Sequence, residues 1–282
     1  MKRVLLDGDA IAYRDEGTGP AVVFVHGTPS SSAEFAEVIA ALSGQFRCVA
    51  IDHLGFGESA KPEHGDYSMT AHYRRLAALL EHLAVREFHL VVHDFGGAIA
   101  LPMVIDHPER VISLTLMNTW LWPLAETEPA LNKHAPLLRS ALMAFLYRRL
   151  NFSARVLVKA AWGSHRPLTR EHHRRYMSAF KTAQERNGTV AFLKTLLDPH
   201  EPAWAMASSL ASHAPRRTLL LWGMGDRVIT PATLRRWTDL LPAARVVELP
   251  NVGHFVADEA PELVVRELRG FLADDGAHRR TA

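Results

Sequence analysis

The sequence lacks several features that mark particular classes of protein. Its 282 residues include a single cysteine, Cys48, so no disulfide can form within the chain, and the apolar residues around Cys48 predict a buried core position. The N-terminal apolar stretch is broken by Asp7 and Asp9 and is too short for a signal-peptide core or a membrane span. No internal repeat and no low-complexity tract is present. We therefore expect a cytoplasmic protein with no membrane partner.

An excess of charge of either sign is also lacking. The 32 basic and 30 acidic residues leave a net charge of +2, and basic pairs such as Arg148–Arg149 are scattered along the chain. We interpret these pairs as solvated faces, and the overall balance predicts no binding to nucleic acid or to an anionic membrane. The sequence has no H-E-x-x-H motif, no P-loop and no G-x-G-x-x-G after a strand, so we expect neither a metal nor an organic cofactor.

What the chain does have is an alternation of strand and helix patterns. Apolar, β-branched runs such as AVVFVHG and FHLVVHD predict strands that are buried on both faces, and stretches with apolar residues at helical spacing lie between them. Thr70 is the candidate N-cap of the helix TAHYRRLAALLEHL. A hairpin formed by VLLDG and AIAYRDEG precedes these elements. The order predicts an α/β protein with a mostly parallel central sheet flanked by helices.

The alternation stops after Asn118. Residues from Trp120 to about Leu210 have a helical pattern and include four of the six tryptophans, and strand-helix alternation then resumes with RTLLLWGMGD. We therefore predict a core domain made of residues 1–119 and 211–282, with an inserted helical cap at residues 120–210. An insertion at this point lies above the carboxyl ends of the parallel strands, where such sheets bind ligands.

Three residues able to carry chemistry follow three of the predicted strands. Asp94 ends the strand FHLVVHD, Asp226 follows TLLLWGMG, and His254 follows the last strand in PNVGHF. Each also has an ordinary interpretation: Asp94 as the N-cap of a helix, Asp226 as the cap of a turn, and His254 as a loop residue. The chain order of nucleophile candidate, acid and histidine, each at a strand end, favours the catalytic interpretation of all three.

The neighbours of the nucleophile candidate suit a sharp strand-to-helix turn. Gly96 and Gly97 allow strand and helix to approach, although Val92 stands where such turns usually have another glycine. The segment VHGTP follows the first long strand and supplies Thr28. The backbone N–H groups of Thr28 and Phe95 are the predicted oxyanion hole.

The motifs VHGTP, DHLGFGES, VVHDFGG, GMGDRVITP and VGHF resemble those of the α/β-hydrolase superfamily over nearly the whole chain. An aspartate nucleophile is similar to that of haloalkane dehalogenases and epoxide hydrolases, and LTLMNT, GMGDRVITP and YMSAF look closer to the dehalogenases. The resemblance implies the α/β-hydrolase fold and a haloalkane dehalogenase that produces an alcohol and a halide, with Asp94, Asp226 and His254 as catalytic residues. Some related dehalogenases carry the acid after the fourth strand, but that place is near Asn118, which cannot act as an acid.

An aspartate nucleophile implies a reaction in two steps. Asp94 is ionised at neutral pH and attacks an sp³ carbon without a base, which forms an alkyl ester on its side chain. His254, oriented by Asp226, then deprotonates a water that attacks the ester carbonyl. The expected partners are water and a small apolar organic substrate, either a halogenated alkane or an epoxide.

The residue that stabilises the leaving group is the open question. Haloalkane dehalogenases usually have a tryptophan donor directly after the nucleophile, where this chain has Phe95. The candidates for substrate or halide binding are Asn118, Trp120, Trp122, Tyr147 and Trp162. Epoxide hydrolases tolerate the phenylalanine and use lid tyrosines to protonate the epoxide oxygen, so epoxide hydrolysis is the alternative. A binding protein on a hydrolase scaffold ranks third, because it predicts the loss of a triad residue and none is lost.

Overall fold

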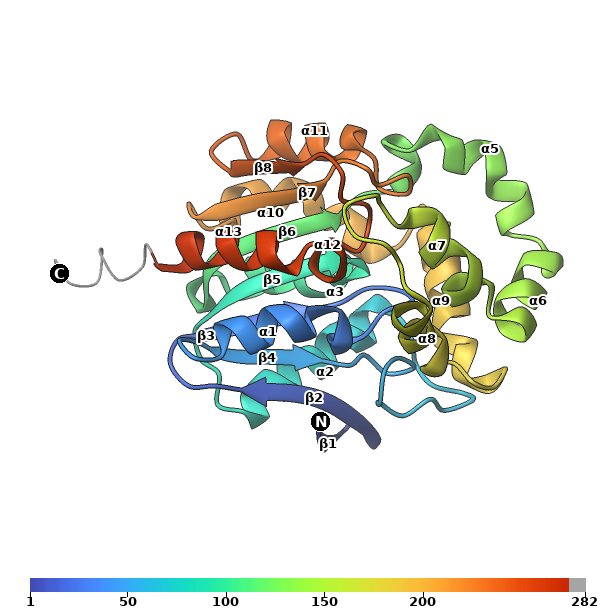
Figure 1. The fold of residues 1–282 in the computed structure, drawn as a ribbon, viewed down its shortest axis with the longest axis horizontal. Coiled ribbons are helices and arrows are strands. Elements are labelled where there is room, and N and C mark those ends of the chain that lie inside the picture. Colours follow the sequence, from blue (N-terminus) through green and yellow to red (C-terminus); the bar gives the residue numbers. More distant parts are fainter. Residues whose placement is uncertain (274–282) are drawn as a thin grey trace, which may run out of the picture.

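An eight-stranded sheet runs through the centre of the computed structural model, which describes residues 1–273 (Figure 1). The strands are β1 (Lys2–Leu6), β2 (Asp9–Glu16), β3 (Ala21–Val25), β4 (Arg47–Ile51), β5 (Phe88–Asp94), β6 (Val111–Thr119), β7 (Thr218–Gly223) and β8 (Arg245–Leu249). Their order in the sheet is β1-β2-β4-β3-β5-β6-β7-β8. β1 and β2 form a hairpin, β2 pairs antiparallel with β4, and the remaining pairs are parallel. The predicted hairpin and mostly parallel sheet are confirmed.

Helices cover both faces of this sheet. On one face lie α1 (Ala36–Leu42), α12 (Val256–Glu259) and α13 (Pro261–Ala273); on the other lie α2 (Met69–His82), α3 (Phe95–Ala100), α4 (Pro102–Asp106), α10 (Ala207–His213) and α11 (Pro231–Leu240). β3 shows why two layers form, because Val22 and Phe24 pack with the first set of helices while Val23 and Val25 pack with the second. Cys48 is buried in the first layer, as predicted.

The structure corrects the predicted start of α2 and divides the segment after β5. The N-cap of α2 is Ser68, whose Oγ accepts a hydrogen bond from the N–H of Ala71 at 3.2 Å. α2 already begins at Met69, so Thr70 lies inside its first turn and cannot be the cap. After β5 the chain forms two short helices, α3 and α4, because Pro102 has no N–H to continue the hydrogen-bonded ladder.

A helical segment joins β6 to β7 and gathers at one end of the sheet (Figure 1). Its helices are α5 (Pro129–Leu138), α6 (Ala141–Leu150), α7 (Val158–Ala161), α8 (Arg170–Ser178) and α9 (Asn187–Leu196), followed by α10. Residues 120–217 contain no strand, as the sequence pattern indicated. The division into a core of residues 1–119 and 211–282 and a cap of residues 120–210 stays a prediction, and residues 274–282 lie outside the described part. No helix within residues 1–273 has the length and apolar character to cross a membrane.

Candidate active site

The chain turns sharply at Asp94, between β5 and α3. Asp94 has φ 51° and ψ −129°, and a positive φ is strained for a residue with a side chain. A Cβ on Gly96 would overlap the carbonyl oxygen of Val25, and one on Gly97 would overlap the hydroxyl of Thr119, so the close approach of α3 to the sheet requires both glycines. The Asp94 carboxylate makes no helix-capping hydrogen bond to α3. This side chain is therefore available for other partners.

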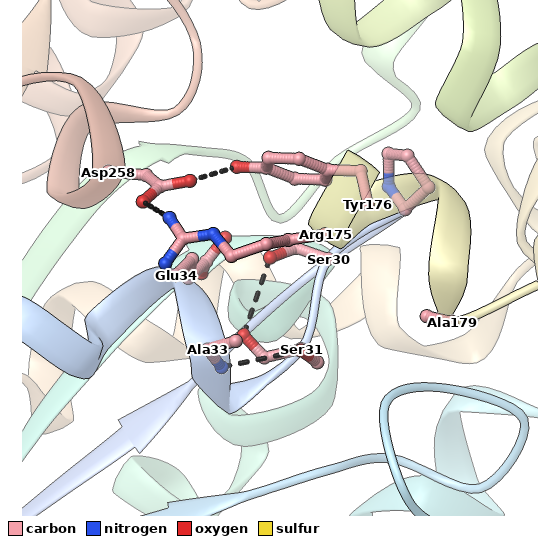
Figure 2. Close-up of a pocket in the computed structure, with 9 residues that line it drawn as sticks. Ser30, Ser31, Ala33, Glu34, Arg175, Tyr176, Ala179 and Asp258 are labelled. Atoms are coloured by element: carbon pink, nitrogen blue, oxygen red, sulfur yellow. Dashed lines mark hydrogen bonds and ion pairs between the residues drawn. The ribbon is translucent and has the colours of Figure 1, made fainter. Parts of the chain in front are cut away.

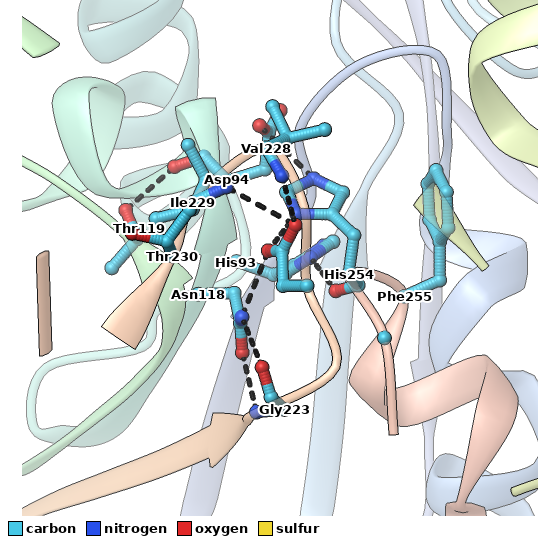
Figure 3. Close-up of polar contacts among 12 residues, drawn as sticks. His93, Asp94, Asn118, Thr119, Gly223, Val228, Ile229, Thr230, His254 and Phe255 are labelled. Atoms are coloured by element: carbon cyan, nitrogen blue, oxygen red, sulfur yellow. Dashed lines mark hydrogen bonds and ion pairs between the residues drawn. The ribbon is translucent and has the colours of Figure 1, made fainter. Parts of the chain in front are cut away.

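Asp94, Asp226 and His254 meet near the carboxyl ends of β5, β7 and β8. Figure 3 shows Asp94 and His254 side by side. Nδ1 of His254 lies 2.7 Å from Oδ2 of Asp226, and Nε2 lies 3.3 Å from Oδ2 of Asp94. All three residues are buried. The histidine thus stands between two carboxylates, which is the arrangement of a catalytic triad. Within residues 1–273, no group of three or more His, Cys, Asp or Glu side chains is arranged to hold a metal ion.

Asp226 is held in place by backbone and side-chain donors. The N–H groups of Val228 and Ile229 donate to its Oδ1 at 2.7 and 3.1 Å, and the amide of Asn118 donates to its Oδ2 at 2.8 Å. Asn118 also exchanges two hydrogen bonds with the backbone of Gly223, at 3.0 and 2.8 Å. The structure therefore places Asn118 against the acid, where it orients the carboxylate and joins β6 to β7.

The other carboxylate oxygen of Asp94 lies in a cradle of backbone N–H groups. Thr28 donates to Oδ1 at 2.7 Å, and the backbone N–H of Phe95 also helps to lower the pKa of this carboxyl group. Gly27 passes so close that a Cβ there would overlap the carboxylate. These are the two N–H groups expected to form the oxyanion hole. They contact Asp94 itself, which suits a reaction whose oxyanion forms on this side chain.

The charges of Asp94 and His254 stabilise each other. Burial by itself would raise the pKa of Asp94, but the hydrogen bond and charge of His254 outweigh burial, and the pKa lies below its ordinary value. Burial by itself would lower the pKa of His254, but the charges and hydrogen bonds of Asp226 and Asp94 outweigh it, and this pKa lies well above its ordinary value. The two shifts act in the same sense and favour an ionised aspartate beside an imidazolium.

A second histidine–carboxylate pair lies behind the triad and was not predicted from the sequence. Nδ1 of His93 lies 3.1 Å from Oε1 of Glu34, and Nε2 of His93 donates to the carbonyl oxygen of His254 at 2.8 Å (Figure 3). His93 and Glu34 are both buried. The pair thus ties β5, which ends at Asp94, to the loop that carries His254. A glutamate in a helical pattern is normally solvated, so only the burial of Glu34 in the fold reveals this contact.

The indole N–H groups of the three candidate tryptophans differ in their partners. Trp122 donates to a threonine hydroxyl at 3.1 Å and Trp162 to the carbonyl of Arg166 at 2.7 Å, so both N–H groups are already occupied. Trp120 packs edge-on against Phe95, with ring centroids 4.9 Å apart. The buried Nε1 of Trp120 has no hydrogen-bond partner within residues 1–273. Of the three, Trp120 is therefore the one with an unused donor beside the nucleophile turn.

The two cap tyrosines also differ. Tyr176 donates to Oδ2 of Asp258 at 2.7 Å (Figure 2), so its hydroxyl is engaged. Tyr147 is buried, and burial together with the negative charge of Asp94 raises the pKa of its phenol. The Tyr147 hydroxyl therefore stays protonated at neutral pH and lies within electrostatic reach of Asp94.

Asp258 joins the cap to the core next to this site. Besides the bond from Tyr176, Asp258 accepts a hydrogen bond from Arg175 at 2.9 Å (Figure 2). Asp258 also lies 2.6 Å from Nε2 of His172, and Arg175, Tyr176 and His172 are all on α8. The ring of Tyr176 packs against Phe255, with centroids 5.1 Å apart. Because Phe255 directly follows His254, these contacts hold α8 beside His254. The sequence carried no signal for this junction, since its partners are 82 or more residues apart.

A comparison with protein families agrees with this geometry. The model of the alpha/beta hydrolase fold family matches residues 20–261, which include the residues of the triad and of the N–H cradle. The chain belongs to the α/β-hydrolase family. Its strand order and its turn at Asp94 are thus features of an α/β-hydrolase.

Within the α/β-hydrolases, the chain is similar to haloalkane dehalogenases. Haloalkane dehalogenase 2 from Mycobacterium bovis is 33% identical over 260 residues, which cover 90% of this chain and 88% of that protein. The cis-3-alkyl-4-alkyloxetan-2-one decarboxylase of Shewanella oneidensis is 31% identical over 277 residues, which cover 95% and 86%. The crystal structure of haloalkane dehalogenase DatA from Agrobacterium tumefaciens has a TM-score of 0.83 and 25% identity, and the match covers 97% of this chain and 96% of that one. This α/β-hydrolase is therefore a hydrolase enzyme of dehalogenase-like type.

Proposed function

We propose that this enzyme hydrolyses the carbon–halogen bond of haloalkanes, with Asp94 as nucleophile. The attacking atom is Oδ2, because Oδ1 is engaged by the N–H of Thr28 whereas Oδ2 faces His254. A bond forms from Oδ2 to an sp³ carbon, and the bond from that carbon to the halogen breaks as the halide leaves with its electron pair. The observation that carries the proposal is an ionised carboxylate, with a lowered pKa, held between the N–H cradle and the histidine.

His254 acts in the second step. Alkylation removes the negative charge of Asp94, so the pKa of His254 loses one of the two anions that raise it, and the ring can become a base. The ring takes a proton from a water that attacks the ester carbonyl carbon, while Asp226 stabilises the imidazolium. The oxyanion forms on Oδ1, where the N–H of Thr28 already donates and where we expect the N–H of Phe95 to donate as the charge develops. Collapse breaks the bond between this carbon and Oδ2, and the alcohol leaves with the proton from the imidazolium.

Trp120 is the proposed donor to the departing halide. Phe95 stands beside the nucleophile and has no side-chain donor, but it packs against the indole of Trp120. A buried N–H without a partner is unfavourable in the resting enzyme and becomes hydrogen-bonded when an anion arrives. The unused donor of Trp120 thus favours the state in which negative charge has moved to the leaving group.

A strained cyclic ether or ester is the second candidate substrate class. In an epoxide or an oxetan-2-one the leaving atom is oxygen, and the similar protein from Shewanella oneidensis is named for an oxetan-2-one. Tyr147 favours this class, because its phenol stays protonated near the charge of Asp94 and can donate to an oxygen leaving group. Both classes share the attack of Asp94 on an sp³ carbon and differ in the donor that meets the leaving atom.

The covalent step can be tested with the variant His254→Ala. This variant keeps the nucleophile and lacks the base, so incubation with 1-bromobutane should add one butyl group to the intact protein, on the peptide that contains Asp94. The matched control is His64→Ala, an exposed histidine outside the site, which should turn over without an adduct. The absence of an adduct with both bromoalkanes and epoxides contradicts the proposal. Halide release measured beside diol formation decides between the two substrate classes.

A further inference from the structure

The cap segment from α5 to the turn before α7 exposes an unusual number of apolar side chains. Within residues 1–273, nine large apolar side chains are exposed, and five of them lie between positions 137 and 156. These five, which we call the apolar cap face, are Leu137, Leu142, Phe145, Leu150 and Val156, with exposed fractions from 41% to 57%. A cluster of this kind on a protein surface marks a site of interaction.

Helix α6 is apolar on two opposite sides. Its residues Met143 and Tyr147 are buried and pack with Leu193 of α9. Leu142 and Phe145 are three residues apart, so they share a face of the helix, and this face is exposed. In Figure 1, α5 and α6 form the edge of the molecule farthest along the cap from the sheet. A helix that is apolar all round is normally buried, and here the second apolar side faces outward.

The same segment contains no acidic residue. Residues 129–170 carry eight of the 32 Lys and Arg residues and none of the 30 Asp and Glu residues, so the rest of the chain has 24 basic against 30 acidic residues, an excess of six negative charges. Seven of the eight are exposed and form no ion pair within residues 1–273: Lys133, Arg139, Arg148, Arg149, Arg155, Lys159 and Arg170. The near-neutral total is thus the sum of a basic cap segment and an acidic remainder. We expected no anionic partner from the net charge alone, and the net charge does not report this separation of basic from acidic residues along the chain.

A groove lies beside the apolar cap face, between α6 and α9. Its volume is about 330 Å³, and its lining includes the apolar Leu138, Val190 and Leu193 and the charged Arg139, Lys194 and Asp198. An apolar groove with two cations at its edge suits an alkyl chain that ends in an anionic group. The groove and the exposed face therefore select the same kind of ligand.

We propose that the apolar cap face docks on the surface of an anionic phospholipid bilayer. The exposed apolar side chains enter the boundary between headgroups and acyl chains, and the surrounding Lys and Arg residues meet the lipid phosphates. A second copy of the chain fits less well, because a two-fold contact places this basic face against itself. Nucleic acid fits less well, because its phosphates leave Leu142 and Phe145 without an apolar partner. The purpose of such docking rests on the proposed function, in which the substrate is apolar and therefore concentrates in a bilayer.

Vesicle flotation of the full chain tests this proposal. We expect the protein to float with vesicles of phosphatidylcholine and phosphatidylglycerol at low salt and to stay behind with phosphatidylcholine alone. Each basic residue near an anionic surface changes affinity by about fivefold, so Arg148→Gln/Arg149→Gln should weaken binding about 25-fold. Leu142→Ser/Phe145→Ser should also lose binding. The matched controls, Arg216→Gln/Arg235→Gln and Leu5→Ser, change exposed residues elsewhere and should bind as the wild type does.

Several results would overturn the docking proposal. These are equal binding to neutral and anionic vesicles, no binding to either, or unchanged binding of the arginine variant, which leaves the apolar packing intact. A dimer that light scattering detects in the wild type and that Leu142→Ser/Phe145→Ser dissociates would assign the face to self-association instead. Flotation uses no substrate, so its outcome is independent of whether Asp94 is alkylated by a haloalkane.

Discussion

The core side and the cap side of the active site are held in different ways. On the core side, the carboxylates of Asp94 and Asp226 already have backbone and side-chain donors, and His254 lies between them. On the cap side, Trp120 has a buried N–H without a partner within residues 1–273, and Tyr147 has a protonated hydroxyl near the nucleophile. Under the proposed mechanism, the core would determine the covalent chemistry, and the cap would determine which leaving atom is accepted.

Substitutions on the core side and on the cap side of the site can test whether the two sides have different roles. A change on the core side should slow every substrate equally, because all substrates pass through the same ester. A change on the cap side should slow some substrates and leave others, because halide and oxygen leaving groups need different donors. Kinetics with a bromoalkane and an epoxide, measured side by side, separate the two behaviours.

The largest effect is expected from Asp94→Asn. The amide is a far weaker nucleophile than the carboxylate, so kcat/KM should fall by on the order of 10⁴-fold or more, with both substrates. Halide release and diol formation are the two measurements. Asp66→Asn replaces an exposed aspartate as the matched control and should keep full activity. Retention of either activity in Asp94→Asn places the nucleophile elsewhere.

The next effect is expected from Trp120→Phe. Removal of a donor to a developing anion costs about 10²–10³-fold, so halide release should fall by that factor while diol formation falls less. Trp122→Phe is the matched control, because its indole N–H is bonded to Thr127 within the protein. An equal loss in the two variants shows that packing, and not the Trp120 donor, matters.

A smaller effect is expected from Asn118→Ala. A hydrogen bond to a charged group contributes about 1.5–3 kcal/mol, so loss of the Asn118 contact to Asp226 should lower kcat by about 10–100-fold. The loss should be the same for bromoalkane and epoxide, because the contact acts on the histidine step. Asn132→Ala, on the surface of the cap, is the control. A strong preference for one substrate in Asn118→Ala argues for a direct role at the leaving group.

The mildest perturbation is a change of pH. The pKa of Asp94 is lowered, so alkylation should stay constant from neutral pH into the weakly acidic range. Ester hydrolysis needs the neutral form of His254, whose pKa is raised, so this step should accelerate as pH rises, about tenfold per unit while the imidazolium dominates. Rapid-quench mass spectrometry of the alkyl-enzyme between about pH 5 and 9 measures both steps. A hydrolysis rate that falls as pH rises is incompatible with His254 as the base.

Much of the site was visible in the sequence because of one topological rule. Asp94, Asp226 and His254 are far apart in the chain, yet each follows a strand of a parallel sheet, and the carboxyl ends of such strands share one edge. By contrast, Glu34 lies in a helical pattern that gave no sign of burial, and its contact with His93 appears only after the helix packs on the sheet. Periodicity reports which face of an element is apolar, and it does not report which polar residue on that element becomes enclosed.

The sequence by itself determined the layered α/β fold, the strained turn at Asp94 and the residues that end the strands. The spacing of apolar residues, the positions of glycines and the order of elements along the chain can all be read locally. Only the tertiary structure decided which donors face the leaving group. The sequence does not distinguish Trp120 from Trp122 or Trp162. Within residues 1–273, the N–H of Trp120 is unbonded because the cap helices and core loops place no acceptor beside it, whereas the other two indoles have one. A hydrogen-bond partner is fixed by packing between distant segments, which no local pattern contains.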